Sequence, residues 1–167
     1  MAGAHGESWH EWTSSDPNGP LLAIRPGGCG DVTQAHVLWR DPSGGSDVVS
    51  GVVYQDRMFS VSSRGVVACR ELTHGGLFWR QRLQGDVFSS LLTGGGLAYT
   101  TSEQGRVDVI ESADEFRLAT TNVLGDRSMV SPAVGGGDIF VRSTEYLTRV
   151  AMAVPGGQPE GVIALAE

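Results

Sequence analysis

The sequence predicts an all-β fold made of a repeated four-stranded unit. Trp39 recurs 40 residues later as Trp79, and the same position of the next copy falls at Ala119. Short runs of β-branched and aromatic residues alternate with Gly, Asp, Ser and Arg, a pattern typical of strands joined by tight turns. No stretch of a dozen residues has helical periodicity. A period near 40 residues with four strands in each copy predicts the blades of a β-propeller.

The repeat holds at several other positions. The alignment of the first two copies needs no gap, and the pairs that lie 40 residues apart are Cys29 and Cys69, Asp31 and Glu71, Ser50 and Ser90, Phe59 and Tyr99, Ser62 and Ser102, and Gly65 and Gly105. In the third copy the step grows to 41 residues, as Ser131, Phe140 and Ser143 show. We therefore expect a one-residue insertion in a loop of that copy.

The predicted strands follow in order along the chain. A partial first blade has strands at 21–25 and 36–40. Two full blades cover residues 48–83 and 87–121, with strands at 52–54, 58–61, 66–69 and 77–79, and then at 91–92, 97–100, 106–110 and 116–118. Residues 129–150 hold three further strands, and 162–165 is a possible last one. Gly94 to Gly96 and Gly135 to Gly137 mark equivalent hairpins, where glycine supplies positive φ.

The predicted organisation is an irregular N-terminal segment at 1–20, propeller blades at 21–150 and a C-terminal tail at 151–167. The blades number roughly three and a half, whereas closed propellers have about four to eight. A half ring leaves blade faces and strand edges exposed. We therefore expect an incomplete propeller that is part of a larger one. Closure of the ring by a second copy of the chain is the less favoured alternative.

Composition and charge exclude several partners and chemistries. The chain is 40% hydrophobic with 24 Gly, which suits a turn-rich β protein. A net charge of −7 disfavours nucleic acid, and no apolar run is long enough for a transmembrane segment. All 12 basic residues are arginine, so lysine Schiff-base and phosphate-loop chemistry is excluded. Met1 to His5 show no signal-peptide pattern.

Cysteines and carboxylates recur at repeat positions. Cys29, Cys69 and Val109 share one position, which favours a small buried side chain, with a disulfide or metal role as the alternative. Asp31, Glu71 and Glu111 share another. We expect these carboxylates to accept hydrogen bonds within a turn of each blade; a calcium or acid–base site is the alternative.

Serines and histidines suggest no catalytic constellation. Ser50, Ser90 and Ser131 are repeat positions, so we expect them to cap turns rather than act as nucleophiles. His5 and His10 lie near Glu7 and Glu11, but their spacing matches no strong metal-site template, and an exposed loop is favoured. His74 is expected in a turn, and any role for His5, His10 and His36 is open.

The segment Cys69-x-Glu71-x-x-x-Gly75-x-x-x-Trp79 resembles the tryptophan-docking motif of pyrroloquinoline-quinone (PQQ)-like propellers, Ala-x-Asp-x-x-x-Gly-x-x-x-Trp. Cys29, Asp31, Ala35 and Trp39 follow it loosely, and in the third copy Val109, Glu111, Glu115 and Ala119 keep only the acidic position. The family's Ser-Pro-x-Val pattern is echoed at 131–134. The resemblance implies that the Trp packs between adjacent blades, against the Ala and Gly positions. It thus assigns a structural blade-docking role to Trp39, Trp79, Gly75, Cys69 and Glu71.

The resemblance implies two classes of function. The first is a non-catalytic module that acts as a scaffold or as a protein- or ligand-binding domain, as in an outer-membrane assembly lipoprotein of this superfamily. The second is part of a quinoprotein dehydrogenase, which would need a catalytic Asp, calcium ligands including Glu and Asn, and usually a Cys–Cys pair. The chain has no Cys–Cys dipeptide, and its asparagines are Asn18 and Asn122. A different propeller enzyme is a third possibility.

The first class is favoured, which predicts no catalytic, cofactor-binding or metal-binding residue and no cofactor. The expected partner is a protein or the remaining propeller blades. The resemblance also suggests a periplasmic or exported protein.

Overall fold

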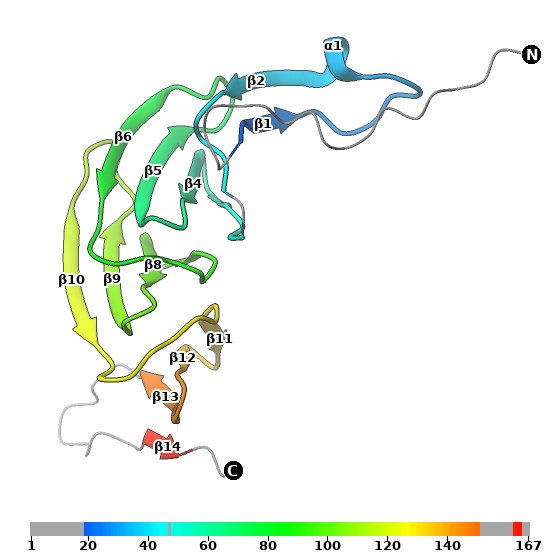
Figure 1. Cartoon of the computed structure of the whole chain (residues 1–167). Coiled ribbons are helices and arrows are strands. Elements are labelled where there is room, and N and C mark those ends of the chain that lie inside the picture. The colour runs from blue at the N-terminus through cyan, green and yellow to red at the C-terminus, as the bar shows by residue number, and fades with distance from the viewer. Residues whose placement is uncertain (1–18, 47, 151–161, 165–167) are drawn as a thin grey trace, which may run out of the picture.

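The computed structural model describes residues 19–46, 48–150 and 162–164, and they form an almost entirely β structure. Four antiparallel sheets follow one another along an arc (Figure 1). We number them blades 1 to 4 in chain order. The predicted all-β class and the four-stranded units are confirmed. Within the described residues, no helix has the length and apolar character needed to cross a membrane.

The strands of each blade run in sequence order across its sheet. Blade 1 has β1 (Leu21–Ile24) and β2 (Val37–Asp41), with the short helix α1 (Thr33–His36) between them. Blade 2 has β3 (Val52–Tyr54), β4 (Arg57–Val61), β5 (Val66–Glu71) and β6 (Leu77–Arg82). Blade 3 has β7 (Leu92–Gly94), β8 (Leu97–Thr101), β9 (Arg106–Glu111) and β10 (Leu118–Val123). Blade 4 has β11 (Ala133–Gly135), β12 (Asp138–Arg142), β13 (Tyr146–Val150) and β14 (Val162–Ala164).

The predicted domain boundaries fall partly on residues 1–18 and 151–161, which lie outside the described residues. The division into 1–20, 21–150 and 151–167 therefore stays a prediction. The possible strand at 162–165 overlaps β14, which pairs with β13.

The extra residue of the third copy lies in the turn between β9 and β10. In blade 2, Glu71 N donates to Gly76 O, which encloses residues 72–75. In blade 3, Glu111 N donates to Arg117 O, which encloses residues 112–116. The predicted loop insertion is confirmed. The strand predicted at 116–118 is corrected to β10 because the longer turn delays the return strand.

The gap-free alignment of blades 1 and 2 is wrong upstream of Trp39. In blade 1, Arg25 N donates to His36 O, and this bond encloses residues 26–35 instead of the four residues of blade 2. Ala23 pairs with Trp39 across β1 and β2, as Cys69 pairs with Trp79 across β5 and β6. The true equivalent of Cys69 is therefore Ala23, and Cys29 and Asp31 lie in the longer loop.

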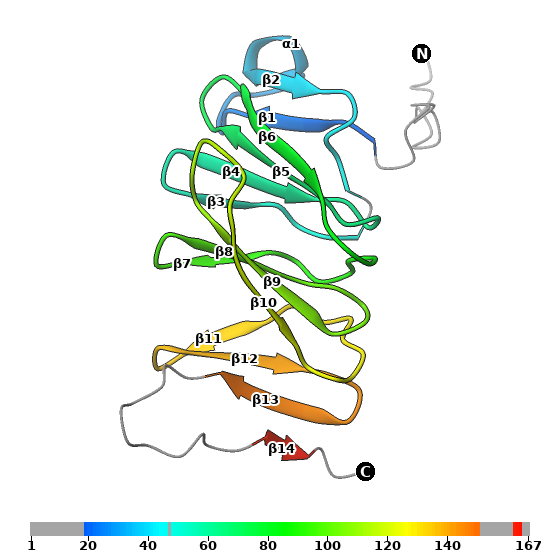
Figure 2. The same cartoon turned by 90° about the vertical axis from the view of Figure 1, so that its left-hand side faces the viewer.

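The two ends of each blade carry different connections. At one end, Val87 N in the linker into blade 3 donates to Ser63 O in the β4–β5 turn. Ser128 N, in the linker into blade 4, likewise donates to Glu103 O. At the opposite end lie the hairpins that join the first two strands of each blade. In blade 3, Ser112 N donates to Gly96 O in the hairpin between β7 and β8. We call these the linker end and the hairpin end; Figure 2 shows the blades stacked with these connections on either side.

The core lies between blades 2 and 3. Its buried members include Phe59, Val67 and Cys69 of blade 2 and Ala98 and Ile110 of blade 3. Trp79 belongs to the same cluster and makes an edge-to-face contact with Phe116, with ring centroids 5.2 Å apart. Among the described residues, the buried hydrophobic cluster thus spans the boundary between these two blades.

Candidate functional site

Each blade has two faces with different roles. The face that carries Cys69 and Trp79 in blade 2 turns toward blade 3, and we call it the leading face. The opposite face, which carries Arg70 and Arg80, turns toward blade 1, and we call it the trailing face. The assignment follows from contacts: Trp79 Nε1 donates to Ala113 O of blade 3 at 2.9 Å, and Arg80 reaches Asp41 of blade 1 at 3.2 Å.

Trp39 makes the corresponding contact between blades 1 and 2. Its Nε1 donates to Leu72 O at 2.8 Å. Its ring lies over Gly75, where an added Cβ would stand 2.5 Å from Trp39 Cδ2 and 2.8 Å from Cε3. Gly75 also has φ 74°, a conformation that L side chains rarely adopt. The Trp contact and the glycine are thus coupled by sterics.

The third blade has no tryptophan at this position. The ladder pairs Thr120, not Ala119, with Val109 across β10 and β9. The expected position at Ala119 is therefore wrong by one residue, because the insertion in the β9–β10 turn precedes it. Thr120 is exposed. The boundary between blades 3 and 4 thus lacks the indole that the two earlier boundaries share.

The two cysteines have different environments. Cys69 is fully buried in the core, and Val109 at the equivalent position is also buried. Burial raises the pKa of the Cys69 thiol to about 11. Cys29 is exposed in the long loop of blade 1, and both thiols are free. The expectation of a small buried side chain therefore fails for Cys29, which is not a repeat equivalent.

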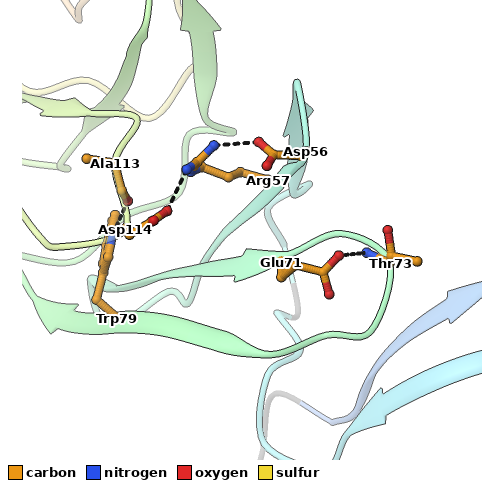
Figure 3. A network of polar contacts seen from close by, with 7 residues as sticks. All are labelled: Asp56, Arg57, Glu71, Thr73, Trp79, Ala113 and Asp114. Carbon is orange, nitrogen blue, oxygen red and sulfur yellow. Dashed lines mark hydrogen bonds and ion pairs between the residues drawn. The ribbon is translucent and has the colours of Figure 1, made fainter.

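Glu71 lies where the β5–β6 turn begins. Its Oε1 accepts a hydrogen bond from Thr73 N and its Oε2 accepts one from His74 N, both at 2.7 Å. Burial opposes ionisation of this carboxyl, but the two backbone donors outweigh it and lower the pKa of Glu71. Figure 3 shows its bond to Thr73. In the long loop, Asp31 Oδ1 similarly accepts from Thr33 N, which lowers the pKa of Asp31.

Charged side chains also join the blades, and the sequence reasoning did not find them. Arg57 of β4 donates to Asp56 and reaches Asp114 of blade 3 at 2.5 Å (Figure 3). The bond to Asp114 raises the pKa of Arg57, and the guanidinium lies 5.3 Å from the Phe78 ring centre. At the preceding boundary Asp41 pairs with Arg70 and Arg80. No repeat signal marks these pairs, because each boundary uses different positions.

The repeated serines form a row of bonds between blades. Ser50 N donates to Ser90 Oγ at 3.0 Å, and Ser90 N donates to Ser131 Oγ at 2.8 Å. The Oγ atoms of Ser90 and Ser131 thus bind the preceding linker rather than capping their own turn, which corrects the expectation. The structural, non-nucleophilic interpretation of these serines remains a proposal.

A small apolar cavity lies between blades 3 and 4. Its volume is about 50 Å³, and its lining includes Val107 and Val109 of the leading face of blade 3 and Val141 and Val150 of blade 4. Val150 is 46% exposed, whereas Ile110, at the same register position of blade 3, is fully buried. This boundary is therefore less completely filled than the one between blades 2 and 3.

The histidines are scattered. His36 Nδ1 lies 2.9 Å from Arg25 O, and His74 Nδ1 lies 3.0 Å from Glu71 Oε2. His5 and His10 lie outside the described residues. Among the described residues, no group of three or more His, Cys, Asp or Glu side chains is arranged to hold a metal ion.

A comparison of the sequence with profiles of known families agrees with the repeated blades of the structure. The sequence profile of the PQQ_2 family, described as outer membrane protein assembly factor BamB, matches residues 29–145, more than half of the chain. The chain belongs to this family. The resemblance predicted from the Trp motif is therefore confirmed at the level of the family. No curated protein matches the sequence.

Two solved structures of other proteins share the fold of this chain. BamB from Moraxella catarrhalis superposes with a TM-score of 0.68 at 15% identity, over 90% of this chain and 45% of that one. The quinohemoprotein alcohol dehydrogenase ADHIIG from Pseudomonas putida HK5 gives a TM-score of 0.54 at 17% identity, over 66% of this chain and 19% of that one. The chain thus spans less than half the length of either of these solved chains. At these identities the likeness shows the fold alone.

Proposed function

We propose that this chain is a non-catalytic PQQ-like propeller module that binds a protein partner as a scaffold. The observation that carries the proposal is the match over residues 29–145 to a family described as an outer membrane protein assembly factor. Such a role requires a rigid set of blades that presents an accessible surface, and the inter-blade contacts supply the rigidity. In this proposal Trp39, Trp79, Gly75, Cys69 and Glu71 are structural: they dock or shape the blades.

An accessible apolar row supports protein binding. Val48, Phe88 and Met129 occupy the same position of three successive linkers, two residues before Ser50, Ser90 and Ser131. Val48 is 58% and Met129 is 55% exposed, and Phe88 is partly exposed. We call these three residues the linker row. Apolar side chains that recur at one end of the blades offer a protein partner a surface to cover.

The alternative, part of a quinoprotein dehydrogenase, has less support. Asn122 lines the apolar cavity, and Glu71 already accepts two backbone bonds. Cys69 is a free, buried thiol without an adjacent cysteine. The described residues therefore do not fit a bound quinone with its calcium ion, and no step through that cofactor is proposed. Export to the periplasm is part of the proposal because the family description concerns the outer membrane.

Site-specific photo-crosslinking in the producing cells tests the proposal. A photo-reactive residue placed at Met129 should yield one discrete protein adduct. An excess of the wild-type protein without the photo-reactive residue should compete for the partner and suppress this adduct. The same excess of the Met129→Asp variant should leave the adduct in place. The matched control is the same residue at Val134, which is 58% exposed on β11 beside the hairpin at the opposite end of the same blade. Equal adducts at both positions, or none at Met129, would contradict the proposed surface.

A further inference from the structure

The outer strand of blade 3 has one unpaired side. Its sheet runs in the order β10-β9-β8-β7, so β10 is an edge strand, and it lies on the outside of the arc (Figure 1). Among the described residues, no strand pairs with the other side of β10. Blade 3 stands between two described blades, so this outer position does not depend on what adjoins blades 1 and 4. An edge strand presents backbone N–H and C=O groups that can pair with another chain.

The sequence of β10 lacks the devices that keep edge strands from pairing. Edges of natural sheets are protected by charged side chains, proline or bulges. β10 reads Leu-Ala-Thr-Thr-Asn-Val and contains neither a charged residue nor proline. The bulge in its ladder lies between Leu118 and Thr120, so residues 120–123 keep a regular register with β9. Leu118 is 43% and Val123 is 71% exposed, so both ends of the strand show apolar side chains to solvent.

The outer strand of blade 2 is protected by charge instead. β6 ends in Arg80, Gln81 and Arg82, which are all exposed. Arg82 pairs with Val66 across β6 and β5, as Val123 pairs with Arg106 across β10 and β9. The position that carries an arginine in blade 2 therefore carries an exposed valine in blade 3. The two edges differ in charge at equivalent positions of the same repeat.

The neutral edge suits pairing with an identical strand. In a two-fold antiparallel pair, each residue stands opposite one on the same face of the sheet. With Thr121 on the axis, Thr120 of one copy stands opposite Asn122 of the other, and no charges meet. The same arrangement of β6 would set Arg80 against its own copy, and like charges directly opposite are destabilising. We propose that β10 pairs antiparallel with β10 of a second copy of this chain.

The residues that flank β10 are compatible with this pairing. Antiparallel strands bring the turn before β10 in one copy toward the linker after β10 in the other. The turn carries Glu115 and Arg117, and the linker carries Asp126 and Arg127. Both signs of charge are present on each side, so the pairing does not set a single sign of charge against itself. It does not depend on the proposed protein-binding function.

Light scattering during gel filtration of the full 167-residue chain tests this inference. The mass should rise with concentration toward twice 17.6 kDa. Asn122→Lys should hold the protein at the monomer mass, because it places a charge on the pairing edge. The matched control is Gln81→Lys, which adds the same charge at the equivalent exposed position of β6. This control should dimerise as the wild type does.

A second variant separates loss of pairing from loss of the fold. Thr120→Lys changes another exposed position of β10 and should also give a monomer. Thermal unfolding of each variant shows whether it is folded. Folded lysine variants of β10 that still dimerise as the wild type does would overturn the pairing, and so would a Gln81→Lys variant that is folded but equally monomeric.

A disulfide-trapping experiment fixes the register. In a Cys29→Ser background, Thr120→Cys and Asn122→Cys are prepared as separate proteins and mixed with copper phenanthroline as the oxidant. The disulfide-linked dimer should be at least several-fold stronger in the mixture than with either protein alone, because Thr120 stands opposite Asn122 in the pair. A wild-type monomer at all concentrations, or no enrichment of the mixed disulfide, would contradict the proposal.

Discussion

Trp39 lies directly over Gly75 across the boundary between blades 1 and 2. The indole Nε1 donates to Leu72 O while the ring occupies the space that a side chain at position 75 would need. Blade 1 thus supplies the indole ring, and blade 2 has a glycine at the point of contact because no Cβ fits there. This relationship makes the packing of neighbouring blades sensitive to a single methyl group.

Gly75→Ala should strongly destabilise the protein. The new Cβ would collide with Trp39, and the backbone at position 75 would keep a positive φ that costs alanine about 1–2 kcal/mol. Thermal unfolding should shift down by several degrees. Gly76→Ala is the control, because the nearest atom to its added Cβ is 4.0 Å away. Equal melting temperatures for the two variants would show that Trp39 does not constrain position 75.

Trp79→Ala should cost about 3–5 kcal/mol, the range for removing a large buried aromatic side chain. The indole packs near Phe59 and Phe116 and donates to Ala113 O. Trp79→Phe keeps part of the ring packing and removes the hydrogen bond, so its loss should be smaller. Urea unfolding measures both. A loss within experimental error for Trp79→Ala would refute the proposed docking role of this residue.

Val107→Ile should be tolerated or stabilising by up to about 0.8 kcal/mol, because the added methylene can enter the cavity between blades 3 and 4. Val67 occupies the same register position in blade 2, where it is fully buried in the core. Val67→Ile should therefore destabilise by about 1–3 kcal/mol through overpacking. The opposite order of the two variants in urea unfolding would mean that the cavity is absent in solution.

The two cysteines should differ in reactivity. At pH 8 a thiol reagent such as dithionitrobenzoate should modify exposed Cys29 rapidly in the folded protein. Cys69 should react only after denaturation, because it is buried and its raised pKa, about 11, keeps the thiol protonated. A Cys29→Ser variant should show almost no fast reaction. Rapid modification of that variant would place Cys69 outside the core.

Stability should depend on pH through Glu71. Its pKa is lower in the folded chain than the ordinary value of 4.5, so its contribution is present above pH 4.5 and is lost as pH falls through the folded pKa. Glu71→Gln should melt below the wild type at pH 7, and the gap should close as pH drops below 4.5. Glu115→Gln, whose side chain is highly exposed, serves as control and should show no such pH-dependent gap.

Periodicity was sufficient to predict the class of the fold and the location of most strands. Trp39 and Trp79 anchored the repeat, and the one-residue slip at Ser131 correctly required a loop insertion. A fixed repeat of 40 residues gave the wrong equivalence where the loop length differs between blades. It aligned Cys29 with Cys69, whereas the strand pairing makes Ala23 the equivalent of Cys69. Hydrogen-bonded pairing tolerates long turns, so the step alone cannot locate an insertion.

The contacts between blades were less predictable. The Trp motif pointed to Gly75, whose close approach to Trp39 is a local, sterically strict feature. The Arg57 and Asp114 pair joins residues that are distant in sequence and uses no repeated position. The side chain of Ser90 could equally have capped its own turn, and only the packing of neighbouring blades directs it to Ser50.

An activity measurement tests whether the chain is a non-catalytic module. The purified chain is incubated with pyrroloquinoline quinone and calcium, and dye-linked oxidation of primary alcohols and aldose sugars is followed. If the module is non-catalytic, the rate should equal that of quinone and calcium without protein. A protein-dependent rate that saturates with substrate and disappears on heat denaturation would contradict it.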